Sequence, residues 1–419
     1  QTWYTSDKEW ELQKPYGYRA MKVEVISHCE ILREYIVKDK ELELVELFEY
    51  EYTGHKDAAG KGDGKVEVLA KGLKIAEKGQ LQMPSMKLLT DKLIVAIGQD
   101  VQEGPPLAVS SKAVHSISYA NALSPEWKVQ MRYSQDREKP IWIVGSGRAA
   151  LEVINDISKN IPGGADRIRC VAGHGSAYQV ANPELGFFEK MVDKPDTPMD
   201  QMLHMIDRFD GSNMAEIVRE LVGRGFLHSA VPDPGSYCLG QASKEEVESA
   251  KVVLTPASER VVKAYLKDVK DGASGPTLEF KPLTPGGSAP AALKVPPGSF
   301  IINCTEQIDL SVTKYHPVVS DSGRVLQPQA LCGQTGLTAA LCTHAWFLDA
   351  LDDGVWKHLP RLELASDDDK RTASFLTLMQ NVVSTKVLEA AIYLKWRESD
   401  REFASTFNVR SDPDHLTYF

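Results

Sequence analysis

One short stretch, PIWIVGSGRAALEVINDISK (residues 140–159), constrains the fold more than any other part of the chain. It opens with a run of β-branched and aromatic apolar residues, which is typical of a buried central strand. The run ends in a glycine turn of the form GxGxxA, made of Gly145, Ser146, Gly147, Arg148, Ala149 and Ala150. Apolar residues then recur with helical spacing as far as Ile157. Strand, turn and helix in this order predict an α/β unit built on a parallel sheet.

The residue types of this turn suit a phosphate-bearing ligand. Gly145 permits a tight turn, Gly147 lets a pyrophosphate approach the backbone, and the small Ala150 lets the helix pack closely on the strand. The free N–H groups and the dipole at the start of the helix attract phosphate. A second strand, RIRCVAG (167–173), follows at the spacing that the motif requires. The turn therefore predicts a dinucleotide site, and the alternative is a tight turn that binds nothing.

The end of the second strand bears on the choice between NAD and NADP. An Asp or Glu there would accept the ribose hydroxyl of NAD, but the sequence VAGHGSAY (171–178) contains neither. Cationic or titratable residues lie nearby in the sequence, namely Arg148, Arg167, Arg169 and His174. They favour NADP, and the alternative is that they are ordinary surface residues. We therefore expect Arg148→Ala to weaken NADPH binding more than NADH binding.

The rest of the chain alternates between strand and helix patterns. A strand at 300–306 (FIINCTE) and a glycine-containing loop leading into a helix at 332–351 are expected. Segments 278–283 and 291–295 predict a hairpin, and KVVLTP (251–256) predicts a strand. Segment 108–139 is expected to be irregular. Further helices are expected after Ser27, within 184–230 and at 373–404.

Composition excludes several classes of protein. Of the 419 residues, 42% are hydrophobic and 25% are charged, which is typical of a globular protein and not of a disordered one. The net charge of −10 disfavours a nucleic-acid partner, and no apolar run reaches the ~18–20 residues of a membrane span. Residues 1–18 do not resemble a signal peptide. The six cysteines form no CxxC pair and no metal-binding cluster, so reduced thiols in the cytoplasm are expected.

Four stretches together resemble a known group of enzymes. They are the glycine turn, SHCEILREYIVKDKELELV (27–45), AVHSISYANAL (113–123) with His115, Ser116 and Tyr119, and the strand pair KLIVAIG (92–98) and FIINCTE. In these stretches the chain is similar to the flavin-containing monooxygenases and to the related ornithine and lysine N-hydroxylating monooxygenases. The likeness extends over most of residues 15–350.

The resemblance implies an α/β fold of two Rossmann-like dinucleotide-binding domains, with the NAD(P) domain inserted in the FAD domain and small antiparallel inserts. Residues 1–139 and 311–372 would form the FAD-type domain, residues 140–310 the NAD(P) domain, and residues 373–419 a C-terminal helical segment. The implied activity uses FAD and NADPH and hydroxylates a nitrogen, sulfur or carbon centre of a small molecule through a flavin hydroperoxide. The cofactors supply that chemistry, so no side chain need act as an acid or a base.

The resemblance also implies roles for particular residues. The turn residues would bind NADPH, and His115 and Ser116 would also bind a cofactor, with His115 lining the cleft between the domains. The loop before the helix at 336–351 would approach the flavin. That loop comprises Gly333, Gln334, Thr335, Gly336 and Leu337. The alternative for the loop is an ordinary helix start capped by Thr335 or Thr338. Apolar positions on the helix at 373–404 could pack a second copy of the chain or the protein's own core.

The sequence departs from the family in its first nucleotide motif. The family opens with an FAD-binding GxGxxG that has no counterpart here, so such a unit would have to precede Gln1. Val109, Ser111, Ala149 and Glu306 also replace family residues. The alternative is a non-catalytic relative that serves as a scaffold or a nucleotide sensor. A flavin disulfide reductase would need a redox cysteine pair, and a short-chain dehydrogenase would need a Tyr-xxx-Lys pair that YLKDVK (265–270) lacks.

Overall fold

The computed structural model describes residues 37, 45, 47, 50–57, 65–72, 84–96, 101–102, 104–180, 198–255, 260–284, 286–305, 307–308, 318–328, 335–351, 359 and 367–399. The helix expected after Ser27 lies outside these residues, apart from Val37, as do Gly333 and Gln334.

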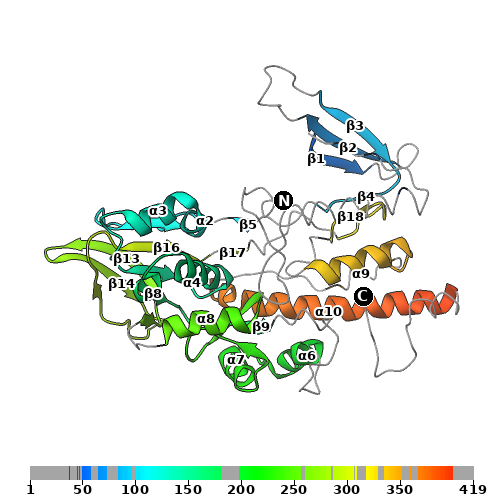
Figure 1. Ribbon diagram of the computed structural model, residues 1–419. Helices are drawn as coiled ribbons and strands as arrows, with labels where there is room; N and C mark the ends of the chain where they lie inside the picture. Colours follow the sequence, from blue (N-terminus) through cyan, green and yellow to red (C-terminus); the bar gives the residue numbers. More distant parts are fainter. Residues whose placement is uncertain are drawn as a thin grey trace.

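A five-stranded parallel sheet forms the centre of the α/β part (Figure 1). Its order is β12 (Val261–Val262), β8 (Ile168–Val171), β7 (Ile141–Val144), β16 (Phe300–Asn303) and β6 (His115–Ser118). β8 and β12 lie on one side of β7 in the sheet, and β16 and β6 lie on the other. The glycine turn thus leaves the sheet at the point where the strand order reverses, which is where open α/β sheets bind ligands. The expected α/β class is confirmed, while the division into an FAD-type and an NAD(P)-type domain stays a prediction.

The two faces of this sheet are covered by different structures. Ile141 and Ile143 of β7 pack with helices α2 (Tyr119–Leu123), α3 (Pro125–Tyr133), α4 (Arg148–Asn160) and α8 (Lys244–Leu254). Trp142 and Val144 pack against a small antiparallel sheet on the other face. Successive side chains of a strand point to opposite faces, so the continuous apolar run IWIV is buried on both sides.

The antiparallel sheet consists of β13 (Tyr265–Gly272), β14 (Gly275–Lys281) and β15 (Leu293–Lys294). The pairing of β14 with β15 confirms the hairpin expected from 278–283 and 291–295. The sequence did not predict β13, because its buried Val269 is surrounded by charged residues. Asp268 accepts hydrogen bonds from the backbone N–H and the hydroxyl of Ser110, and these bonds tie the strand to the segment before β6.

Two local expectations are wrong. Residues 251–256 were expected to form a strand, but residues as far as Leu254 belong to α8. Ser243 and Glu246 form a capping box at the start of this helix, which buries Val247, Ala250, Val253 and Leu254 and leaves Val252 exposed. Segment 108–139 was expected to be irregular, but it contains β6, α2 and α3. Ser118 and Ser124 cap these two helices, and Pro125 occupies the first turn of α3.

A second, three-stranded sheet follows in the order β10 (Leu227–His228), β9 (Ser176–Val180) and β11 (Ser236–Ala242). Its apolar side packs with α6 (Pro198–Arg208) and α7 (Met214–Gly223), which confirms helices within 184–230.

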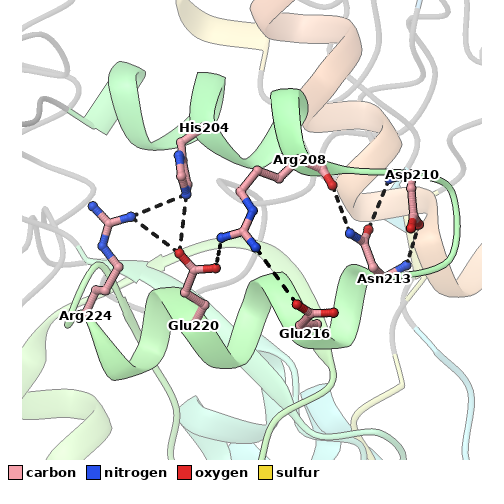
Figure 2. A network of polar contacts seen from close by, with 7 residues as sticks. All are labelled: His204, Arg208, Asp210, Asn213, Glu216, Glu220 and Arg224. Carbon is pink, nitrogen blue, oxygen red and sulfur yellow. Dashed lines mark hydrogen bonds and ion pairs between the residues drawn. The ribbon is translucent and has the colours of Figure 1, made fainter.

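A polar network joins α6 to α7 (Figure 2). Glu220 forms ion pairs with Arg208, with His204 at 3.4 Å and with Arg224 at 3.6 Å. Partial burial raises the pKa of Glu220, but hydrogen bonds and charges from His204 and Arg208 outweigh it and lower the pKa. The network therefore stabilises the packing of the two helices most when Glu220 is ionised.

The remaining elements complete the described chain. β1 (Tyr50–Asp57), β2 (Val66–Gly72) and β3 (Met86–Thr90) form an antiparallel sheet. β4 (Leu93–Ile94) pairs with β18 (Val325–Leu326), β5 (Val101–Gln102) pairs with β17 (Gln307–Ile308), and α5 (Gly164–Arg167) precedes β8.

The long helix α10 (Asp367–Ser399) contacts α9 (Thr335–Phe347), β11 and α6, and it extends along the molecule beneath α9 (Figure 1). It begins earlier than the expected residue 373. Within the described part of the chain, no helix is both long enough and apolar enough to span a membrane.

Candidate functional site

The glycine turn is fixed by a close approach between Gly145 and the end of β16. Gly145 has φ +112°, and a Cβ atom built there would lie 2.6 Å from the Cys304 carbonyl oxygen. Its N–H donates to the Val171 carbonyl at 2.9 Å, and the Cys304 N–H donates to the Val144 carbonyl at 2.8 Å. Only glycine fits this position without strain, because both the φ angle and the adjacent backbone exclude a side chain.

Ser146 and Tyr178 hold the middle of the turn. Ser146 is buried, and its hydroxyl donates to the Ala172 carbonyl at 2.8 Å. The hydroxyl of Tyr178 on β9 donates to the Ser146 carbonyl and, at 3.1 Å, to the Gly147 carbonyl. Burial raises the pKa of Tyr178 well above its usual range, so the hydroxyl stays a donor.

The start of α4 has the features that an anion needs. Gly147 is the N-cap residue, no side chain caps the helix, and its first turn carries no acidic residue. A Cβ atom at Gly147 would meet only the Cys238 sulfur, at 3.8 Å. Ala149 and Ala150 are buried against the sheet. The first N–H groups of a helix lack intrahelical partners, so these features fit a pyrophosphate.

A thiol from β11 covers part of this helix start. The backbone N–H of Arg148 hydrogen-bonds the Cys238 sulfur. Burial raises the pKa of Cys238, while this hydrogen bond and the Arg148 guanidinium act in the opposite direction. A neutral sulfur thus accepts the hydrogen bond that a phosphate oxygen could accept.

The side chain of Arg148 is turned toward α8. Its guanidinium forms an ion pair with Glu246 at 2.8 Å, and both side chains are largely buried. Glu246 also accepts from the Ser243 N–H within the capping box. The Arg148 Nη1 atom is buried without a hydrogen-bond partner. Arg148, the cation expected to select NADP, is therefore paired with the carboxylate of Glu246, and its Nη1 atom still lacks a hydrogen-bond partner.

The predicted role of Arg167 and Arg169 in NADP selection is wrong. Arg167 donates to the carbonyls of Lys139 and Met131, and Arg169 donates to the Asp166 carbonyl. These contacts lie at the beginning of β8, whereas the glycine turn faces the end of the strands. His174 does follow the end of β8, where its ring stands edge-on to that of Tyr265 at 5.9 Å.

The structure does not bring His115 and Ser116 to the glycine turn. His115 pairs in register with Phe300 at the beginning of the strands, while the turn follows their ends. The His115 Nε2 atom lies 2.9 Å from Asp136, and its ring stacks on that of Phe300. The Ser116 hydroxyl donates to the Leu107 carbonyl at 2.7 Å. That these two residues contact a cofactor stays a prediction.

The expected flavin loop is described only in part. Thr335, Gly336 and Leu337 form the first turn of α9, whereas Gly333 and Gln334 lie outside the described residues. Thr338 is buried, and its hydroxyl lies 3.1 Å from that of Thr385 on α10. The loop's role toward a flavin therefore stays a prediction as well.

Sequence reasoning missed three residues that shape the turn: Tyr178, Cys238 and Glu246. Each is 31 or more positions from its partner in the turn, and Tyr178 and Cys238 become neighbours only because β9 and β11 pair in parallel register. No local sequence pattern predicts such contacts.

No known protein family matches the chain, and no curated protein matches it. One solved structure with detectable similarity is that of L-lysine 6-monooxygenase from Pseudomonas syringae, at 11% sequence identity. The alignment covers 90% of this chain and 78% of the other, with a TM-score of 0.34.

Proposed function

We propose that this protein is an FAD- and NADPH-dependent oxidoreductase, a monooxygenase that hydroxylates a nitrogen, sulfur or carbon centre of a small molecule. The glycine turn at the switch point of a parallel sheet supports a dinucleotide site. The flavin and the monooxygenase activity are inferred from the sequence motifs around His115 and Gly145 together with the α/β fold. When bound, the two cofactors would supply the hydride transfer and the activation of oxygen.

The single observation that carries the proposal is the start of α4. It combines a glycine N-cap without a side-chain cap, a first turn without acidic residues, and a small buried Ala150 against the sheet. A Cβ atom at Gly147 would meet only the Cys238 sulfur, at 3.8 Å, so packing does not require a glycine here, whereas the close approach of a pyrophosphate would.

The chain's own residues would bind and orient NADPH. The N–H groups at the start of α4 would hold the pyrophosphate, and the adenosine end would extend over the residues that follow β8, including His174. Arg148 could reach a 2′-phosphate only by sharing its guanidinium between that phosphate and Glu246. Arg148→Ala therefore remains the variant that tests NADP selection: we expect NADPH binding to weaken more than NADH binding.

A second function is favoured by the same residues. Cys238 accepts from the Arg148 N–H, and Glu246 pairs with the Arg148 guanidinium, so the protein's own groups engage part of the predicted site. This arrangement suits a non-catalytic relative that keeps the fold as a scaffold or a nucleotide sensor. The two functions differ in whether the purified protein holds a flavin and turns over NADPH.

The test is the visible absorption spectrum of the purified full chain, before and after incubation with FAD and removal of free cofactor. We expect the bands of oxidised flavin and their loss on anaerobic addition of NADPH. NADPH binding without flavin bands would support the nucleotide sensor. A colourless protein that neither binds FAD nor oxidises NADPH would refute the monooxygenase proposal.

A further inference from the structure

Tyr178 makes contacts that ordinary packing does not require. Its side chain is buried, and its hydroxyl reaches two consecutive carbonyls of the glycine turn, those of Ser146 and Gly147. The tyrosine comes from β9, which belongs to the sheet of β10, β9 and β11 and not to the five-stranded sheet that carries the turn. A long-range hydrogen bond therefore fixes the conformation of the turn from outside.

The geometry of the peptide bond gives this contact a consequence for ligand binding. A trans peptide is planar, so a carbonyl and the following N–H point in opposite directions. The Ser146 carbonyl shares its peptide with the Gly147 N–H, and the Gly147 carbonyl shares its peptide with the Arg148 N–H. The Gly147 carbonyl also accepts the Leu151 N–H of α4 at 3.1 Å, so the Tyr178 hydroxyl and the helix together set the direction of the two N–H groups.

We propose that Tyr178 is a positioning residue of the dinucleotide site, which orients the N–H groups of Gly147 and Arg148 toward the pyrophosphate. This inference rests on the proposed function of the turn. The Arg148 N–H already has the Cys238 sulfur as an acceptor, so a pyrophosphate oxygen would have to share or replace that contact. Cys238 and Tyr178 are paired in register on β11 and β9, so the two strands together shape the turn.

The chain offers a matched control. Tyr237 is also buried, lies on the adjacent strand β11, and has a hydroxyl without a hydrogen-bond partner. Tyr178→Phe and Tyr237→Phe thus remove the same atom from neighbouring strands, but only the first change removes a hydrogen bond to the turn.

The experiment measures dissociation constants of the full-length wild type and both variants by calorimetry. The probes are ADP-ribose, which contains the pyrophosphate, and adenosine 2′-monophosphate, which lacks it. For Tyr178→Phe we expect roughly tenfold weaker binding of ADP-ribose, and a change within about twofold for adenosine 2′-monophosphate. Tyr237→Phe should leave both constants within about twofold of the wild type.

Equal affinity of Tyr178→Phe and the wild type for ADP-ribose would overturn the inference, as would an equal weakening of both probes. A wild type that binds neither probe would instead refute the proposed function on which the inference rests. If Tyr178→Phe does not fold, 3,5-difluorotyrosine incorporated at position 178 replaces it. This analogue keeps the hydroxyl as a stronger donor, so equal or tighter ADP-ribose binding is expected, and weaker binding would overturn the inference.

Discussion

Replacing Gly145 with alanine tests the reasoning about the turn most directly. Two separate penalties are expected. The first is conformational, because Gly145 has φ +112°, where an L-residue costs about 1–3 kcal/mol. The second is steric, because the new Cβ atom would lie 2.6 Å from the oxygen and 2.9 Å from the carbon of the Cys304 carbonyl. Real Cβ atoms do not approach this closely, so the backbone has to shift.

The backbone at Cys304 has little freedom to move away. Its N–H donates to the Val144 carbonyl, and Asn303 before it donates to the Pro105 carbonyl at 2.8 Å. Relieving such overpacking costs about 1–3 kcal/mol. The free energy of unfolding of Gly145→Ala should therefore fall by about 2–6 kcal/mol, a large part of the ~5–15 kcal/mol typical of folded proteins.

Gly163→Ala is the matched control. Gly163 has φ +67°, but a Cβ atom there would meet nothing within 4 Å, so only the conformational penalty applies. Urea unfolding followed by far-UV circular dichroism gives the free energy of unfolding of both variants and the wild type. We expect Gly145→Ala to lose about 1–3 kcal/mol more than Gly163→Ala. Equal losses in the two variants would refute the close approach to Cys304.

Three further outcomes are expected. Gly147→Ala should change the free energy of unfolding by less than about 1 kcal/mol. It should weaken NADPH binding in a calorimetric titration, because the new methyl group would occupy the space of the proposed pyrophosphate, and unchanged affinity would contradict the proposed site. Burial raises the pKa of Cys170 and of Cys342 to about 12, so iodoacetamide at pH 8 should modify both in urea and neither in the native protein, as read by mass spectrometry; equal native labelling would contradict their burial. Partial burial raises the pKa of Glu220, but its basic neighbours outweigh this effect and lower the pKa. Ionised Glu220 therefore stabilises the folded protein above the ordinary pKa of a glutamate, and this stabilisation is lost as the pH falls through the lowered pKa of Glu220. Glu220→Gln should therefore lower the thermal midpoint at pH 7 and approach the wild type at pH 3, and an equal difference at both pH values would contradict the network.

The sequence determined the local structures whose causes lie within a few residues. The apolar run before Gly145 gave a central strand, the glycine turn gave the start of α4, and the hairpin between β14 and β15 followed from its turn residues. These predictions hold because burial on both faces, a positive φ angle and turn chemistry each leave a local pattern. The strand expected for KVVLTP is wrong because that prediction also used only the local pattern. Its β-branched residues favour a strand, but the capping box at Ser243 extends a helix into them.

The tertiary structure decided which side chains meet at the turn. Tyr178, Cys238 and Glu246 reach it from a second sheet and a distant helix, and the pairing of β9 with β11 aligns the first two. It also places Arg167 at the beginning of β8, the end away from the glycine turn, although the two are close in sequence. The sequence alone thus determined that a strand ends in a phosphate-compatible turn. Only the folded chain decided what surrounds that turn, because contacts between distant segments depend on strand pairing and packing, which local patterns do not encode.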